Sequence, residues 1–326
     1  MKNELVKLGI DLAHNATGEF SQGNPEVALR NGFKELIGSD KLDYKTMRRN
    51  GALVFEAMEE ILEVLITEGL EDQFNEFVDI RNLALGDREF FTVDDYHLFN
   101  VGIVSQGNGD TRRQRLGRTT FTVDTDWRSV KIYDNLAMFI AGRINWGQMI
   151  AKVGRSFNAQ IAADIYSAIV AGYNTLQTPY LYNGTADRVQ LLTLAEHIRA
   201  ATDQDVTVFG TKLALQQFTP QFVQYGGDMI DQRNQDAFFR VIDGLKMVEI
   251  KQSHVPGTDS FAVADNFLLV IPNGEQKIIK MVLEGEPIVR ETPAGVNMDD
   301  SIEYEFRKKY GLMAITSTKY GAYLIS

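Results

Sequence analysis

The feature that most constrains this 326-residue sequence is a long β-patterned stretch from Phe90 to Tyr133. Its two halves, YHLFNVGIVSQ and RTTFTVDTDWRSVKIY, alternate β-branched and aromatic residues with polar ones, which is typical of strands. Between them lies the Gly- and Arg-rich segment QGNGDTRRQRLGR. We therefore expect a long two-stranded hairpin with a charged tip. Because isolated hairpins are marginally stable in water, this one needs another surface to lie on.

Charge is segregated along the same part of the chain. The formal net charge is −11, from 33 basic and 44 acidic residues. Residues 51–100 carry 2 basic and 13 acidic groups, whereas residues 101–150 carry 7 and 4. Four arginines fall within seven positions of the hairpin tip: Arg112, Arg113, Arg115 and Arg118. The acidic and basic patches are either two solvated faces of a monomer or surfaces that pair between copies of the chain.

Composition excludes several classes of protein. The acidic balance is unsuitable for a general DNA coat, because such a surface repels phosphate. With no cysteine there is no disulfide framework, thiolate nucleophile or iron–sulfur ligand set. The N-terminus has no apolar signal region and no window is apolar enough to span a membrane, so we expect synthesis in the cytoplasm and no membrane partner.

Helical patterns flank the hairpin. Residues 1–50 lack a sustained apolar period and are expected to form an extended or weakly ordered arm. Residues 51–70 are expected to form an amphipathic helix, continued by a shorter helical piece to Val78. Its polar side carries four carboxylates: Glu56, Glu59, Glu60 and Glu63. A second apolar stripe predicts a helix from about Leu136 to Tyr173, with a bend or break at the glycines of its first half.

The remaining chain alternates strands and helices. Residues 181–288 predict a compact α/β unit of about 100 residues, in which DVTVFGT, FLLVIPNG and IIKMVLEG are strands. The last 28 residues predict two strands around a turn at Tyr310 and Gly311.

Nothing in the sequence requires catalytic chemistry. The four histidines are far apart, and the common phosphate-binding and nucleophile motifs are missing. Asp94, Asp95 and His97 form the one cluster that suggests a metal or acid–base site. The arginine tip lacks interleaved aromatic residues for stacking on RNA bases. We expect no catalytic, cofactor-binding or metal-ligating residue and no cofactor, and hence no enzyme.

Three segments together resemble the major capsid proteins of tailed phages. They are DVTVFGTKLALQQF, FLLVIPNGEQKIIKMVLEGEP and SIEYEFRKKYGLMAITSTKYGAYLI. Each motif is loose, and their order and spacing over residues 90–326 carry the resemblance. It implies an α+β fold of the Hong Kong 97 type with an N-arm, an E-loop hairpin, a peripheral domain with a long spine helix, and an axial domain.

The resemblance divides the chain as follows: an arm at 1–50, an acidic amphipathic helical region at 51–88, the E-loop hairpin at 89–134, the spine helix at 135–180, the axial domain at 181–287, and closing strands of the peripheral domain at 288–326. It implies self-assembly into an icosahedral virion shell of hexamers and pentamers that encloses double-stranded DNA without sequence-specific binding. A portal and a separate scaffolding protein are the further partners expected.

We expect the arginines of the tip to dock on carboxylates of an adjacent copy, with the Glu56–Glu63 face a candidate partner. Residues 88–130 contain no lysine, so the E-loop isopeptide cross-link of some family members is not expected. The opposite view of the N-terminus is that residues 1 to about 80 are removed on maturation. Rival interpretations are an encapsulin nanocompartment shell, a soluble metal or acid–base enzyme that uses Asp94, Asp95 and His97, and a nucleic-acid-binding module.

Overall fold

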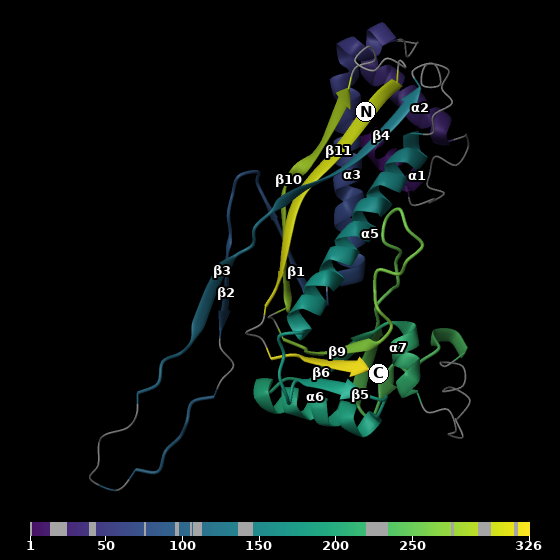
Figure 1. The fold of residues 1–326 in the computed structure, drawn as a ribbon. Helices are drawn as coiled ribbons and strands as arrows, with labels where there is room; N and C mark the ends of the chain where they lie inside the picture. The colour runs from purple at the N-terminus through teal and green to yellow at the C-terminus, as the bar shows by residue number, and fades with distance from the viewer. Residues whose placement is uncertain are drawn as a thin grey trace.

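A computed structural model describes most of the chain. The described residues are 2–13, 25–38, 44–74, 76–94, 98–104, 106, 113–135, 146–219, 234–274, 277–292, 301–315 and 319–326. They form two sheets with helices against them and a third, two-stranded ladder that projects from the body (Figure 1).

The first sheet has four strands in the order β1-β10-β11-β4. Their bounds are Val78–Leu83 for β1, Ile279–Thr292 for β10, Ser301–Ala314 for β11 and Asp126–Asn135 for β4. β1 runs parallel to β10, and the other two pairs are antiparallel. Segments from the middle and the end of the chain therefore meet in one sheet.

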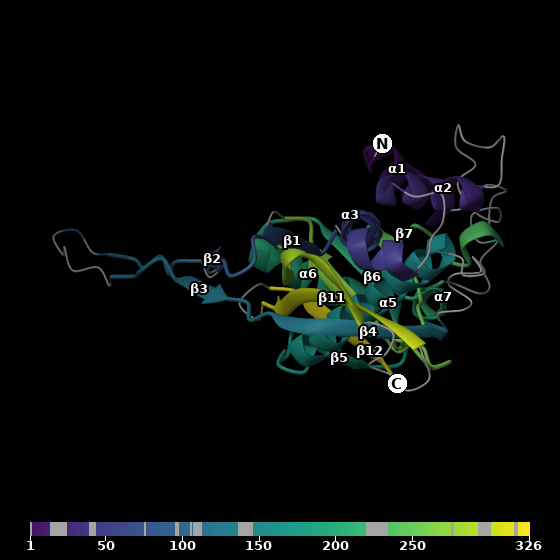
Figure 2. The same cartoon turned by 90° about the horizontal axis from the view of Figure 1, so that it is seen from above.

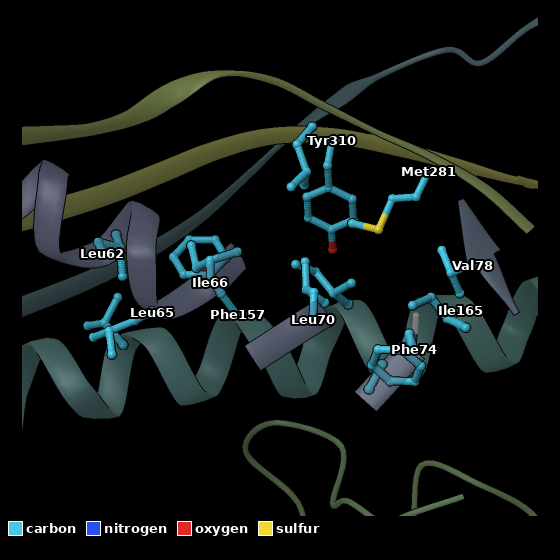
Figure 3. Close-up of a cluster of buried hydrophobic side chains, with 14 of the residues drawn as sticks. Leu62, Leu65, Ile66, Leu70, Phe74, Val78, Phe157, Ile165, Met281 and Tyr310 are labelled. Atoms are coloured by element: carbon cyan, nitrogen blue, oxygen red, sulfur yellow. The ribbon is translucent and has the colours of Figure 1, made fainter. Parts of the chain in front are cut away.

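Two long helices, α3 (Tyr44–Phe74) and α5 (Trp146–Tyr173), cover one face of this sheet (Figure 1). Their apolar residues recur at helical spacing and are buried between the two helices and the sheet. Figure 3 shows side chains of α3 facing Phe157 and Ile165 of α5, with Met281 and Tyr310 above them from the sheet. α5 continues through Gly147 and Gly154, so this described helix has no break at either glycine. The start expected at Leu136 lies outside the described residues.

The second sheet has six strands in the order β5-β12-β9-β6-β8-β7. Their bounds are Leu181–Gly184 for β5, Gly321–Ile325 for β12, Phe267–Pro272 for β9, Val206–Gly210 for β6, Leu245–Glu249 for β8 and Val241–Ile242 for β7. Every residue of β6 and β9 is buried.

The central strands of this sheet join two cores. Because alternate residues of a strand point to opposite faces, Phe209 and Leu269 pack in the core of α3 and α5, whereas Val208 and Leu268 pack in a second core. Helices α6 (Arg188–Thr202) and α7 (Lys212–Phe218) contribute to this second core.

The N-terminal region differs from the extended arm expected for residues 1–50. It forms α1 (Lys2–Ala13), α2 (Pro25–Ile37) and the beginning of α3, which starts at Tyr44. Leu5, Leu8, Leu29 and Phe33 are buried in the same core as α3 and α5. The apolar residues that hold these short helices are few and scattered, so they did not stand out as a sustained period.

Three further expectations were wrong in detail. The helical piece expected to reach Val78 ends at Phe74, and Val78 begins strand β1. The second strand of the hairpin is interrupted after Thr122, and β4 pairs with β11 instead of with the other hairpin strand. β11 passes straight through Tyr310 and Gly311, where a turn was expected, and β12 joins the six-stranded sheet instead of the strands that close the first sheet.

Candidate interaction site: the hairpin and its root

The hairpin begins as a short ladder between β2 (Phe90–Asp94) and β3 (Arg118–Thr122). Beyond it, residues 98–104 and 113–117 continue as two arms that reach away from the body (Figures 1 and 2). We call these two segments the hairpin arms. Their large apolar side chains are exposed: Leu98, Phe99, Val101, Ile103, Val104 and Leu116.

A side chain links the two arms. Gln114 accepts a hydrogen bond from the amide of Asn100 through Oε1 and donates one to its carbonyl through Nε2, each at 2.8 Å. The backbone groups of Asn100 thus pair with a side chain of the opposite arm in place of its backbone. Val101 and Ile103 expose 96% and 107% of their reference areas. The arms therefore present apolar surface that their own chain leaves uncovered.

The root of the hairpin, in contrast, is held on the face of the four-stranded sheet opposite to α3 and α5. Phe91 of β2 is 1% exposed and stacks on Phe121 of β3 at 5.8 Å between ring centroids. The Arg81 guanidinium lies 4.5 Å from the centre of the Phe91 ring, and Lys280 Nζ lies 5.8 Å from it. Such cation–π contacts strengthen where the cation is removed from water.

The two cations have acidic partners. Lys280 Nζ donates to Asp79 at 2.7 Å, and Arg81 forms an ion pair with Glu89 in the loop before β2. Burial alone would raise the pKa of Asp79, but the hydrogen bonds and charges of Lys280 and Arg81 lower it. The carboxylate therefore stays ionised and holds both cations beside the Phe91 ring.

A second anchor lies at a bulge in β10. Glu284 pairs with Lys309 and Ile288 pairs with Arg307, so three residues of β10 stand opposite the single residue Lys308. The bulge begins at Gly285, whose φ of +66° is in the region that favours glycine. Here the strand turns the Glu284 carboxylate toward the two ends of the hairpin.

Glu284 accepts hydrogen bonds from three segments of the chain. Its carboxylate accepts from the Gly86 amide at 2.9 Å, from Lys309 Nζ at 2.7 Å and from the Thr125 hydroxyl. Burial alone would raise the pKa of Glu284, but these hydrogen bonds and the charge of Lys309 lower it to about 2. The group is therefore an anion at any physiological pH.

The side of the bulge that faces the helices is held by one residue of β11 and one of α3. Lys308 Nζ donates to the Gly285 carbonyl at 2.6 Å, and Glu59 accepts from the Val289 amide at 2.7 Å. Burial lowers the pKa of Lys308, while the charges of Glu63 and Glu286 act in the opposite direction. Two of the carboxylates expected on a free acidic face, Glu59 and Glu63, thus face their own sheet.

The structure places the other charged residues of the sequence analysis as follows. Arg113, Arg115 and Arg118 are exposed, whereas Arg112 lies outside the described residues. Glu56 is exposed and Glu60 is half-buried on α3. The hairpin arms point away from α3 in both views, so the arms of one chain do not reach its own α3 (Figures 1 and 2).

The candidate enzyme site is not assembled in the part that can be described. Asp94 ends β2, but Asp95 and His97 lie outside the described residues. Among the residues that the structure does describe, no group of three or more histidine, aspartate or glutamate side chains is placed to hold a metal ion. Within the same residues, no helix is both long and apolar enough to cross a membrane.

Comparison with known proteins identifies the family. Residues 10–323 match the family model described as "SPbeta prophage-derived putative capsid protein YonB". The chain belongs to this capsid protein family. A search among curated proteins gives no match.

Solved phage capsids share the fold of this YonB-family chain. The mature capsid of bacteriophage PhiM1 matches with 11% identity and a TM-score of 0.53, covering 78% of this chain and 86% of that one. The native GTA particle capsid matches with 11% identity and a TM-score of 0.54, at 78% and 90% coverage. The cyanophage Pam1 capsid matches with 9% identity and a TM-score of 0.51, at 78% and 91% coverage. The α+β architecture is the Hong Kong 97-type capsid fold, and the chain is a capsid shell protein.

Sequence reasoning found the hairpin but missed the residues that anchor it. A glycine at the end of a predicted strand, Gly285, and a proline two positions later, Pro287, were the available signal of a bulge. Nothing local indicated that Glu284 would meet Gly86 and Thr125, because these contacts join segments about 160 to 200 positions apart.

Proposed function

We propose that this protein is the major shell subunit of a tailed-phage or prophage particle, and that it forms hexamers and pentamers of an icosahedral shell around double-stranded DNA. A separate scaffolding protein and a portal complete the assembly. The protein acts by buried area, strand contacts and charge pairing, and needs no catalytic residue.

One observation carries this proposal most directly. The hairpin arms expose a run of large apolar side chains at the end of a projection whose root is packed on the four-stranded sheet. Contiguous apolar surface of this kind marks an interaction site. A neighbouring copy is the occupant that a shell subunit always has beside it.

The basic residues of the tip add positive charge to the proposed contact. We propose that Arg112, Arg113, Arg115 and Arg118 dock on carboxylates of the adjacent copy. Glu56 is the exposed member of the acidic face of α3 and is the first candidate partner. Exposed ion pairs are weak singly, so the effect rests on the cluster and is sensitive to salt.

The experiment is particle assembly of the purified protein, followed by sizing and negative-stain microscopy. We expect wild-type particles of tens of nanometres, alone or with the scaffolding protein added. Reversal of the four arginines to glutamate should reduce the yield several-fold at low salt. The matched control replaces the same four arginines with lysine, which preserves the charge and should preserve assembly. Equal yields from the reversed and wild-type chains at every salt concentration would overturn the charge-docking proposal.

The contents of the particle test the genome-packaging part of the proposal. Particles from phage-producing cells should protect double-stranded DNA from nuclease. An encapsulin-type compartment would instead contain a cargo enzyme and no protected genome. That result would overturn the genome-packaging proposal and support a nanocompartment shell.

A further inference from the structure

The two ends of the hairpin converge on one side chain. Gly86 lies in the loop that leads into β2, and Thr125 lies in the junction that leaves β3 for β4. Both donate hydrogen bonds to the Glu284 carboxylate, which belongs to neither end but to the central strand β10. One residue of the sheet therefore binds the entry and the exit of the projection.

The binding site of this carboxylate is well enclosed. The Glu284 side chain is 4% exposed, and Lys309 on the adjacent strand supplies the compensating charge at 2.7 Å. Charge-assisted hydrogen bonds to a buried anion are among the stronger ones in proteins, and a donor left without its acceptor there is costly. The arrangement fixes where the backbone of Gly86 and the hydroxyl of Thr125 can lie.

Because the hairpin is long, a small rotation at its root moves the ends of the hairpin arms by a large distance. The eleven residues from 94 to 104 span about 33 Å if fully extended, because ten steps of roughly 3.3 Å separate the first from the last. A rotation of about 10° at the root would move the end of such a lever by about 6 Å, more than one strand spacing of about 4.8 Å. Small changes at the root therefore decide which surface of a neighbour the hairpin arms reach.

The bulge itself has independent support. Lys308 and Glu59 hold Gly285 and Val289 from the helix side of the sheet. The Phe91 cluster separately holds β2 on the sheet. Removal of the Glu284 charge should therefore loosen the direction of the hairpin while the sheet and the bulge remain folded.

We propose that Glu284 is a positioning residue that sets the direction of the hairpin relative to the four-stranded sheet, and thereby the geometry with which one subunit reaches the next. The first half concerns the single chain. The second half rests on the proposed function as a shell subunit.

The absence of cysteine from the sequence makes a direct measurement possible. Spin labels on Leu116→Cys in the hairpin arm and Leu53→Cys on α3, both at exposed positions, would report the distance between hairpin and body. The measurement is pulsed electron–electron resonance on the unassembled full chain. Wild type should give one narrow distance distribution, and Glu284→Gln should broaden it or shift its maximum by several ångströms.

Matched variants separate positioning from general stability. Glu305→Gln removes a carboxylate that pairs with Arg307 at 2.8 Å in the same sheet, away from the hairpin root, and should leave the distribution unchanged. Thr125→Val removes only the hydroxyl that binds Glu284 and should reproduce part of the broadening, even if Glu284→Gln proved difficult to fold. An unchanged distribution in folded Glu284→Gln, or in Thr125→Val if only that variant folds, would overturn the proposal.

Assembly of the same variants tests the second half. Glu284→Gln should give fewer closed particles and more particles of irregular size, whereas Glu305→Gln should assemble like wild type. Regular wild-type-like particles from Glu284→Gln would overturn the link to subunit geometry. Failure of the wild type itself to assemble, with a hairpin that moves in the variant, would count against the shell function and leave the positioning role standing.

Discussion

Gly311 shows how one residue allows the hairpin to join the sheet. It lies within β11, and residues 123–125, which join β3 to β4, pass next to it. A Cβ at Gly311 would lie 2.0 Å from the Asp124 carbonyl oxygen, a backbone atom that cannot swing aside. The residue that suggested a turn is therefore a glycine because another segment crosses closely over a straight strand.

We predict that Gly311→Ala destabilises the protein by about 1–3 kcal/mol, the usual cost of forcing a group into a packed site. The measurement is the free energy of unfolding by denaturant. Gly102→Ala is the control, since a Cβ at Gly102 meets no atom within 4 Å and should change the free energy by less than about 0.5 kcal/mol. Equal values for the two variants would contradict the crossing at Gly311.

The lowered pKa of Glu284 makes the free energy of unfolding depend on pH in a defined range. Its pKa is about 2 in the folded protein, against 4.5 for an ordinary glutamate. A lowered pKa means that the ionised group stabilises the fold fully above about pH 4.5 and loses this effect as the pH falls toward 2. We predict that wild type is more stable than Glu284→Gln at pH 6 and that the difference shrinks steadily between pH 4.5 and 2.5. A constant difference over that range, measured by thermal or urea unfolding, would contradict this assignment.

At the scale of elements, local patterns predicted most strands and helices but not their partners. The alternation in RTTFTVDTDWRSVKIY correctly indicated β structure on both sides of residues 123–125. It could not show that β3 pairs with β2 while β4 pairs with β11, because both pairings satisfy the same alternation. The parallel strand β1 follows an amphipathic helix closely, and its first residue, Val78, was assigned to the helical pattern.

The charged tip illustrates the same limit for the candidate site. The sequence indicated correctly that Arg113, Arg115 and Arg118 would be exposed on a projection. The residues that contact the root of the projection, Phe91 and Glu284, act through partners distant in sequence. Contacts of this kind depend on the tertiary fold, and a single sequence carries no direct signal of them.

Substitutions in the hairpin arms should affect assembly of the particle without affecting folding of the chain. Leu98, Val101 and Ile103 are exposed in the chain, so their replacement by serine should change the melting temperature little. Between subunits the same side chains would be buried, at roughly 1.5–3 kcal/mol each. We predict that the triple serine variant stays folded by circular dichroism and loses most of its particle yield in the assembly assay. Normal yield from the triple variant would show that the arms do not bury these side chains in the particle.

At the scale of the whole molecule, the N-terminal helices belong to the main core. α1 and α2 pack on α3 and on each other. Gly9 of α1 allows close approach to Ile61 of α3, and Gly32 of α2 allows close approach to Leu5 of α1. α3 in turn packs against both the four-stranded sheet and α5 (Figure 3). Removal of residues 1 to about 80 would take away α3 and part of β1, which contribute buried side chains to the main core.

Retention of these helices is therefore the final prediction. Four buried side chains of α1 and α2, at roughly 1.5–3 kcal/mol each, contribute an amount comparable to the 5–15 kcal/mol stability of a typical domain. Phe33→Ala should cost about 3–5 kcal/mol, whereas Val27→Ala on the exposed side of α2 should cost less than about 0.5 kcal/mol. Mass spectrometry of assembled particles should find the subunit with residues 1–80 still attached. Particles built from a chain that begins after residue 43 would show instead that another surface of the shell covers α3 once α1 and α2 have gone.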